Sequence, residues 1–199
     1  MFDDRPGAPE SNFLWAGTQN EVGQFLHAYH STWLSASLLE EDRQNALVDA
    51  IFAASRPWSM SLHFNKGLAG APEAELAAAR DTPMNPAVLD AFALVIMGGE
   101  SAPAFPGLHG HEPNLSAARR AASAMSRAME ALLQVVDRPA SYVGETDYFE
   151  SNWQASFWGS NYNRLLAIKR KYDPEGLFFV HHGVGSEYWS ADGFTRVSG

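Results

Sequence analysis

Four stretches of the chain carry hydrophobic patterns that predict β-strands. Residues 22–39 are rich in aromatic and β-branched side chains, which favours a strand, although a helix remains an alternative. Residues 56–65 alternate apolar and polar side chains, so one face of that strand is polar and faces either water or a pocket. Residues 92–97 are continuously apolar, which is typical of a buried strand, and residues 140–149 are predicted as another strand.

Helical spacing of apolar residues separates these predicted strands. It predicts helices over 40–55, 73–80, 116–136 and 161–172. A further short helix follows Asn85 and Pro86, which are suited to the cap and the first helical position. The helix over 116–136 has the clearest apolar stripe and is predicted to pack on the core. That stripe contains Ala118, Ala122, Met125, Met129, Leu132 and Val136.

Irregular segments are predicted at residues 1–20 and at the Gly- and Pro-rich residues 98–114. Pro174 disfavours helical geometry at the preceding residue, so "DPEG" predicts a turn that leads into an apolar strand at 177–180. Strands and helices alternate without an internal repeat, which indicates a mixed α and β fold around one sheet. Strand order and direction do not follow from the pattern.

Composition narrows the class of protein. The 199 residues suffice for one domain, or one domain with an appended piece, and can bury a sizeable core. The 23 acidic against 14 basic residues give a formal charge of -9, which argues against general binding to nucleic acid or to an anionic membrane. The absence of cysteine excludes disulfides and thiolate chemistry. With no apolar run near the ~20 residues of a membrane span and no signal-peptide pattern, we expect a cytoplasmic protein.

The last quarter of the chain contains a long and specific motif. "SYVGETDYFE" is followed by "FWGSNYNRLLAIKRKYDPEGLFF", and together they resemble the C-terminal signature of the berberine bridge enzyme-like FAD-linked oxidases of the vanillyl-alcohol oxidase superfamily. The matching positions are Tyr142, Asp147, Trp158, Gly159, Asn161, Tyr162, Arg164, Leu165, Lys169, Asp173 and Pro174.

The resemblance implies an α+β fold in which an antiparallel sheet is covered by helices on one face. Residues 1–150 would be the substrate-binding domain, and residues 151–199 a C-terminal segment whose helix and tail return to a flavin domain. Neither the Gly-rich pyrophosphate loop nor the flavin-bearing histidine of the family has a counterpart in this sequence. We therefore expect a fragment, a split gene product or a truncated chain. FAD would be bound mainly by an upstream domain, in the same or a separate chain.

In such oxidases a base takes the hydroxyl proton of a small-molecule substrate, an alcohol or sugar-like compound, while a hydride passes to the flavin, and oxygen then reoxidises the flavin. By resemblance, Glu145 occupies the position where several relatives carry a tyrosine base. A carboxylate is a useful base only where desolvation raises its pKa above the usual ~4.3. The alternative is that Glu145 only accepts hydrogen bonds at a strand end. Tyr142 and Gly144 are predicted to contact the cofactor, on the side of the strand opposite Glu145.

Asn161 is predicted to share a helix face with Leu165, Ile168 and Tyr172 and to contact the flavin, because an asparagine in a buried stripe needs a hydrogen-bond partner. The alternative is that Asn161, or the residue before it, caps the helix.

Four further residues are candidate substrate contacts. His63 and Asn65 share one strand face and could orient a hydroxyl group, although a solvated face explains them equally well. Tyr29 and Trp33 share a parity that suits a sugar-like or aromatic ligand, although such residues are more often core.

No metal site is predicted. His109 and His111 lie in an unrestrained loop, and His181 and His182 would face opposite sides of a strand. Two other classes stay open: a non-catalytic ligand-binding or partner protein that has lost its flavin half, and one domain of a two-chain enzyme.

Overall fold

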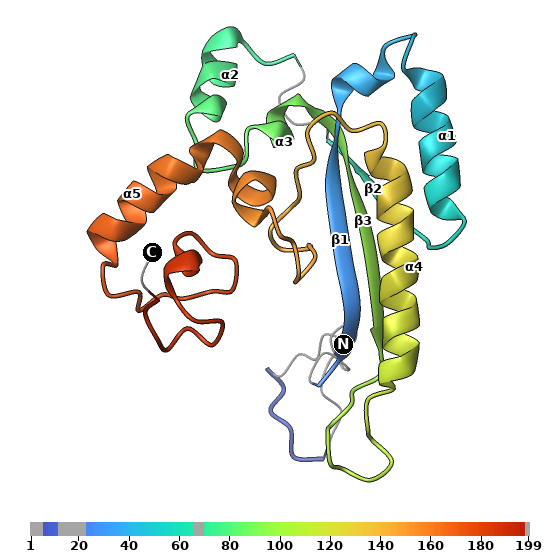
Figure 1. Ribbon diagram of the computed structural model, residues 1–199, viewed down its shortest axis with the longest axis vertical. Helices are drawn as coiled ribbons and strands as arrows, with labels where there is room; N and C mark the ends of the chain where they lie inside the picture. The colour runs from blue at the N-terminus through green and yellow to red at the C-terminus, as the bar shows by residue number, and fades with distance from the viewer. Residues whose placement is uncertain (1–5, 12–22, 66–69, 198–199) are drawn as a thin grey trace.

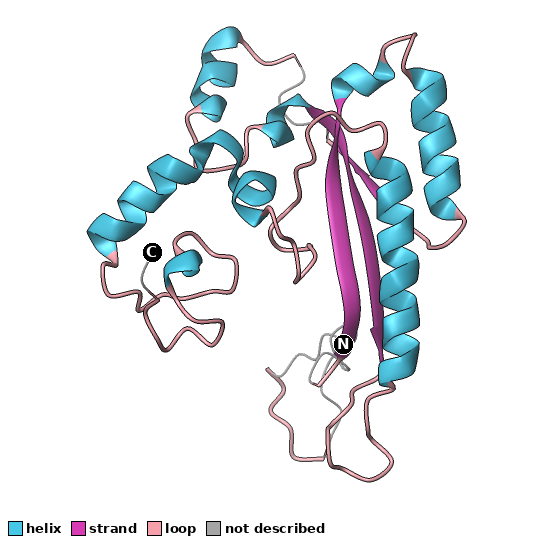
Figure 2. Cartoon of the chain, in the orientation of Figure 1, coloured by secondary structure: helices cyan, strands magenta, loops and turns pink. Residues whose placement is uncertain are grey.

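Three antiparallel strands form the sheet at the centre of the structure (Figures 1 and 2). The central strand β3 (Ala91–Ser101) pairs with β1 (Phe25–Ser35) on one side and with the short β2 (Ser61–Phe64) on the other. The strands at 22–39, 56–65 and 92–97 are thereby confirmed in kind, although β2 is shorter than predicted.

The structure is a computed structural model that describes residues 6–11, 23–65 and 70–197. Most of the predicted loop over residues 1–20 lies outside the described residues.

Two helices cover one face of the sheet. α1 (Gln44–Ser55) and α4 (Leu115–Leu133) pack beside each other, and α4 runs along β1 and β3 (Figure 1). Arg43 ties the two helices together, because its guanidinium donates to both carboxylate oxygens of Asp137 at 2.8 and 3.1 Å and to the Val135 carbonyl. Because helices cover one face of an antiparallel sheet, the predicted α+β class is confirmed.

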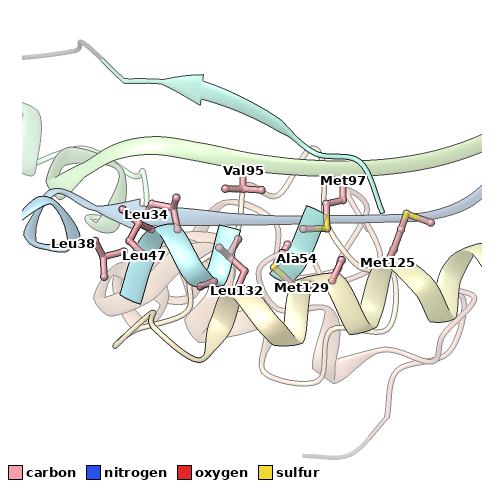
Figure 3. Close-up of a cluster of buried hydrophobic side chains, with 11 residues drawn as sticks. Leu34, Leu38, Leu47, Ala54, Val95, Met97, Met125, Met129 and Leu132 are labelled. Carbon is pink, nitrogen blue, oxygen red and sulfur yellow. The ribbon is translucent and has the colours of Figure 1, made fainter. Parts of the chain in front are cut away.

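The hydrophobic core lies between this face and the two helices, as Figure 3 shows. Leu34 and Val95 point from the sheet toward Leu132 and Met125, all four being almost completely buried. The predicted stripe of α4 is thus confirmed at its centre. Its buried members are Ala118, Met125, Met129 and Leu132, whereas Ala122 and Val136 are half-buried.

The described residues contain three other α-helices, which lie beyond the sheet. They are α2 (Glu73–Arg80), α3 (Ala87–Asp90) and α5 (Tyr162–Tyr172). Pro86, predicted as the first helical residue, stands at the N-cap position of α3, and Asn85 Oδ1 just before it accepts a hydrogen bond from Ala87 N at 3.0 Å. None of the described helices is both long and apolar enough to cross a membrane.

Short helical turns connect these elements. Ala36–Leu39, Gly159–Asn161 and Ser186–Tyr188 are 3₁₀ turns, and Gln154–Trp158 is a turn of π-helix.

Contacts from the α2–α3 connection hold the start of α5. Arg164 forms an ion pair with Asp81 at 2.7 Å, and Asn161 Nδ2 donates to the carbonyls of Thr82 and Met84 at 3.0 and 2.6 Å. Asn161 stands at the N-cap position of α5, but its side chain makes no cap hydrogen bond there. The predicted buried stripe is wrong, because Tyr172 is 73% exposed and no residue of α5 is buried.

Three segments depart from the predicted pattern of strands and loops. Leu177, Phe178 and Val180 are exposed. The Asp173 carboxylate accepts from the backbone N–H groups of Leu177 and Phe178, so these groups do not join a sheet. β3 extends to Ser101 inside the predicted loop, because Gly98 and Gly99 admit the Tyr29 ring and the Met125 side chain against the strand.

The segment 140–149 is not a strand. Trp33 N donates to Ala140 O at 2.9 Å, but the next contacts with β1 use the side chains of Ser31 and Ser141. A turn then closes where Glu145 N donates to Tyr142 O at 3.0 Å. The prediction that Glu145 points to the opposite side of a strand from Tyr142 and Gly144 assumed a regular strand. Because the segment is not a strand, that assumption does not hold.

Leu132→Ala should lower the free energy of unfolding by about 2–5 kcal/mol, because Leu132 is fully buried and its loss leaves a cavity under the sheet. Leu115→Ala on the same helix is the matched control. Leu115 is 54% exposed, so its change should stay within about 0.5 kcal/mol. Urea unfolding of both variants measures the difference, and equal losses would contradict this account of the core.

Candidate active site

A cavity of about 840 Å³ lies beside the edge of β1. The first half of β1 forms one wall, residues 143–149 form a second, and His181 and His182 of the C-terminal segment form a third. Residues of α4 close part of the remaining side. Its size is that of a small-molecule site.

Ser31 of β1 fixes the wall that carries Glu145. Its Oγ accepts from Tyr142 N at 3.0 Å, and its carbonyl accepts from Ser141 Oγ at 2.8 Å. Because Ser31 is almost completely buried, water competes little for these bonds. The turn that follows places the half-buried Glu145 on the cavity wall.

Tyr29 lies on the β1 side of the same cavity. Its ring covers Gly98 of β3, where an added Cβ would fall 2.7 Å from Tyr29 Cε1. Burial raises the pKa of Tyr29, and the negative charges of Glu100 and Glu145 add to the rise. The Tyr29 hydroxyl donates to Glu100 Oε2 at 3.5 Å, so its one proton is directed to that carboxylate, while its oxygen can still accept a hydrogen bond.

His181 and His182 of the third wall belong to a stack of four rings. Tyr148 stacks on His181 at 4.0 Å between ring centroids, His181 on His182 at 3.8 Å, and His182 on Trp153 at 5.4 Å. We name these four residues the aromatic column. The prediction that the two histidines face opposite ways is wrong, because His182 has a φ of +57° and the backbone reverses there.

The aromatic column also fixes one histidine tautomer. His181 Nε2 lies 2.8 Å from the Tyr148 carbonyl oxygen. A carbonyl can only accept, so Nε2 carries the proton and donates. This bond joins the C-terminal segment to the wall that holds Glu145.

Two histidines at the cavity are kept neutral by their surroundings. Burial lowers the pKa of His30 more strongly than Asp147 and Glu150 raise it. The pKa of His182 is lowered first by burial and then by the neighbouring His181. Neutral imidazoles can accept or donate a proton, but they add no positive charge to the cavity.

The structure brings together only part of the predicted site. Tyr29, Gly144 and Glu145 line the 840 Å³ cavity, and Tyr142 begins the turn that carries Gly144 and Glu145. Trp33 instead lines a second cavity, of about 730 Å³, together with Asn85, Pro139 and Asn152.

The other predicted residues lie elsewhere. His63 is exposed on β2. Asn65 donates to the carbonyls of Val88 and Ala91 at 2.7 and 3.2 Å, and Asn161 makes the contacts with the α2–α3 connection described above. In the structure these amides hold backbone segments in place.

Sequence reasoning missed His30, Asp147 and Tyr148 as cavity residues. His30 has the opposite strand parity to Tyr29, and only the position of the 143–149 wall at the strand edge brings both to one cavity. The His181–His182 pair was a visible signal, but its geometry depends on the backbone at His182. Among the described residues, no group of three His, Cys, Asp or Glu side chains could hold a metal ion.

A family model described as "Berberine and berberine like" matches residues 141–185. Relatives are similar over part of the chain. FAD-linked oxidoreductase notD of Aspergillus sp. is 47% identical over 89 residues, which cover 43% of this chain and 14% of that protein. VAO-type flavoprotein oxidase VAO615 of Thermothelomyces thermophilus is 48% identical over 56 residues, 28% of this chain and 10% of that protein.

Two solved structures share the fold. The VAO-type flavoprotein MtVAO615 of Myceliophthora thermophila has a TM-score of 0.59 and 29% identity, over 81% of this chain and 28% of that one. MtVAO713 of the same organism has a TM-score of 0.57 at 21% identity, over 81% and 27%. The matched part of this chain thus spans less than a third of either flavoprotein.

Lowering the pH should destabilise the fold through the cavity histidines. Because the folded-state pKa of His182 and of His30 lies below the usual 6.5, their contribution to stability is complete above about pH 6.5 and is lost as the pH falls through the lowered values. His182→Asn tolerates the positive φ and removes one titrating group, so its free energy of unfolding should fall less between pH 7 and pH 5. Denaturant unfolding at each pH measures this slope.

His109→Asn serves as the control, because the His109 side chain is fully exposed and lies outside the cavity. Its slope should equal that of the parent chain. A His182→Asn slope as steep as the parent's would contradict the assignment.

Proposed function

We propose that this chain, which belongs to the berberine bridge enzyme-like FAD-linked oxidoreductases, is the substrate-binding part of an oxidase that removes a hydride from a hydroxylated substrate. The observation that carries the proposal is the half-buried Glu145 on the wall of the 840 Å³ cavity, with Tyr29 on the wall beside it. A carboxylate and a phenol at one small-molecule cavity suit the binding and deprotonation of a hydroxyl group.

The turn before Glu145 fits a flat ring system such as the isoalloxazine of FAD. Tyr142 is 46% exposed, and its ring lies so close to Gly144 that a Cβ there would fall 2.9 Å from Tyr142 Cε1. A ring and a bare backbone therefore form one surface, on which Tyr142 and Gly144 would hold the flavin edge. We keep Asn161 as a cofactor contact through its side-chain oxygen, since its Nδ2 is used by Thr82 and Met84.

Bound FAD would supply the hydride acceptor and pass the electrons on to oxygen. The residues of this chain would supply the base that takes the proton of the substrate hydroxyl group. Glu145 takes the hydroxyl proton as the C–H bond breaks, so the carbon ends as a carbonyl, with one proton on the carboxylate and one hydride removed. Tyr29 would contact the substrate through its ring and its hydroxyl oxygen, since its proton is donated to Glu100.

His63, Asn65 and Trp33 have weaker claims as substrate contacts. His63 is exposed on β2, and the amide of Asn65 is already bonded to backbone carbonyls. Trp33 would contact only a substrate that reaches the 730 Å³ cavity. We assign the first contacts with the substrate to Tyr29 and Glu145.

The exposed apolar side chains of the C-terminal half support a partner domain. Phe149, Leu177, Phe178 and Phe194 are between 74% and 88% exposed. Large exposed apolar side chains gathered in one part of a chain are typical of a surface that another unit covers. We infer that an FAD-binding domain, in the same or a separate polypeptide, packs there, and that residues 151–199 form the segment returning to it.

In the complete flavin-loaded enzyme, Glu145→Gln should lower the rate of flavin reduction by about two to four orders of magnitude, because glutamine keeps the size of the side chain but accepts no proton. Substrate affinity should change much less. Anaerobic stopped-flow reduction across pH separates this step from reoxidation and product release. Glu75→Gln on α2, exposed and outside the 840 Å³ cavity, is the control and should reduce its flavin at the parent rate. A Glu145→Gln enzyme with the parent rate and pH profile would remove Glu145 from the mechanism.

Purified by itself, this chain should be colourless and bind FAD weakly, because the Tyr142–Gly144 turn offers a surface for one face of the ring and no phosphate loop. Absorbance near the flavin bands after gel filtration with FAD measures this. A stoichiometric yellow complex would contradict the need for a second domain and favour a complete cofactor site in this chain.

A further inference from the structure

The aromatic column continues beyond the cavity to helix α5. Its last ring, Trp153, meets the ring of Tyr162 edge to face, with 5.5 Å between the ring centroids and 86° between the ring planes. Trp153 is only 7% exposed, so this contact lies inside the fold. Tyr162 is the first residue of α5. A continuous series of ring contacts therefore connects the wall that carries Glu145 with the start of that helix.

The Tyr162 hydroxyl is bonded twice to the C-terminal segment. It donates to Glu187 Oε1 and accepts from Gly185 N at 3.3 Å. Gly185 is buried, so water has little access to its N–H group in place of this bond. Burial, and then the hydrogen bond to Glu187, raise the pKa of Tyr162. The phenol therefore keeps its proton near pH 7 and remains a donor to Glu187.

Two partners thus fix the part of the C-terminal segment that lines the cavity. His181 donates to the Tyr148 carbonyl, and Gly185 donates to the Tyr162 hydroxyl. Only three residues separate His181 from Gly185, and two backbone hydrogen bonds of Gly183 hold that connection in a turn. A displacement of Gly185 is therefore passed on to the histidine rings, and from His181 to the wall at Tyr148.

Tyr162 has a fixed place from which it can hold these groups. Asn161 and Arg164, on either side of it in the sequence, are bonded to the α2–α3 connection. The Tyr162 ring is therefore anchored to a part of the fold that contributes no residue to the 840 Å³ cavity. Tyr162 itself does not line that cavity either, so it can act on a bound substrate only through other residues.

We propose that Tyr162 is a positioning residue for the proton-transfer step. Its hydroxyl holds the C-terminal segment, and the aromatic column transmits this hold to the wall, so that Glu145 stays in place beside Tyr29. The proposal rests on the proposed function in one respect, that Glu145 is the base.

Tyr162→Phe tests the proposal, because it keeps the ring that meets Trp153 and removes only the hydroxyl. In the complete flavin-loaded enzyme, anaerobic stopped-flow measurements should show a limiting rate constant of flavin reduction lowered about tenfold or more, since misplacement by about 1 Å can cost about a hundredfold. The substrate Kd should change by less than about twofold. The pH profile should keep its shape, because Glu145 remains the base. Tyr172→Phe, at a side chain that is 73% exposed, is the control and should keep the parent rate.

Further variants locate the effect. Glu187→Ala should lower the rate constant, and Glu187→Gln, whose amide oxygen still accepts from the phenol, should restore it to within about twofold of the parent. His181→Phe keeps a flat ring but loses the donor to Tyr148 O, so it should lower the rate constant as Tyr162→Phe does. Because both changes act through the same wall, the double variant should stay within about twofold of the slower single variant.

The same changes are compared without flavin in the ¹⁵N-labelled full chain. Tyr162→Phe should shift the amide signals of residues 143–149, and Tyr172→Phe should leave them in place. Shifts confined to residues 159–188, a Tyr162→Phe enzyme with the parent rate, or losses that simply multiply in the double variant would overturn the proposal. If Glu145→Gln instead reduces its flavin at the parent rate, the proposed function fails, while the amide shifts still decide whether Tyr162 positions the wall.

Discussion

The candidate site depends on the hydrogen bonds of Ser31. This residue lies in β1, and its hydroxyl and carbonyl together bind the backbone and side chain of residues 141 and 142. Because Ser31 is buried, these bonds are protected from water and hold one irregular segment against the strand edge. Without that attachment, Glu145 and Asp147 would belong to a loop with no fixed relation to Tyr29.

A second attachment acts on the same segment from the opposite end. The Tyr148 carbonyl accepts from His181, and the Tyr148 ring stacks on His181 within the aromatic column. The wall that carries Glu145 is therefore held between β1 and the C-terminal segment. A site built this way is pre-organised by side chains that lie over 100 residues apart in sequence, which is how an irregular segment can keep a reactive group in place.

The sheet explains why the site lies where it does. α1 and α4 cover one face and bury the core, so a ligand can reach only the other face or the strand edge. The first half of β1, residues 143–149 and residues 181–182 meet at the edge of β1 and line one cavity. Ala122 and Ser126 of α4 close part of the cavity, so it lies beside the core at this edge of the sheet.

Much of the local structure follows from the sequence alone. The apolar stripe centred on Met125 and Leu132 has a 3.6-residue period, and a helix with such a stripe buries it whatever the topology. The apolar run at 92–97 is equally local, and it lies within β3. The C-terminal motif is a specific series of residues and not a hydrophobic periodicity. Its resemblance to a family suggested Glu145 as a candidate base.

The tertiary structure decided which residues share a cavity. His30 and Tyr29 point to opposite faces of β1, yet both line the cavity, because the 143–149 segment passes the strand edge instead of joining the sheet. Nothing in the sequence around Asn161 indicates its partners, but its side-chain amide donates to the backbone carbonyls of Thr82 and Met84. Local patterns determine periodicity and termini, since these depend on neighbouring residues. The composition of a site depends on contacts between distant segments, and here it depends on hydrogen bonds of single side chains that no local pattern encodes.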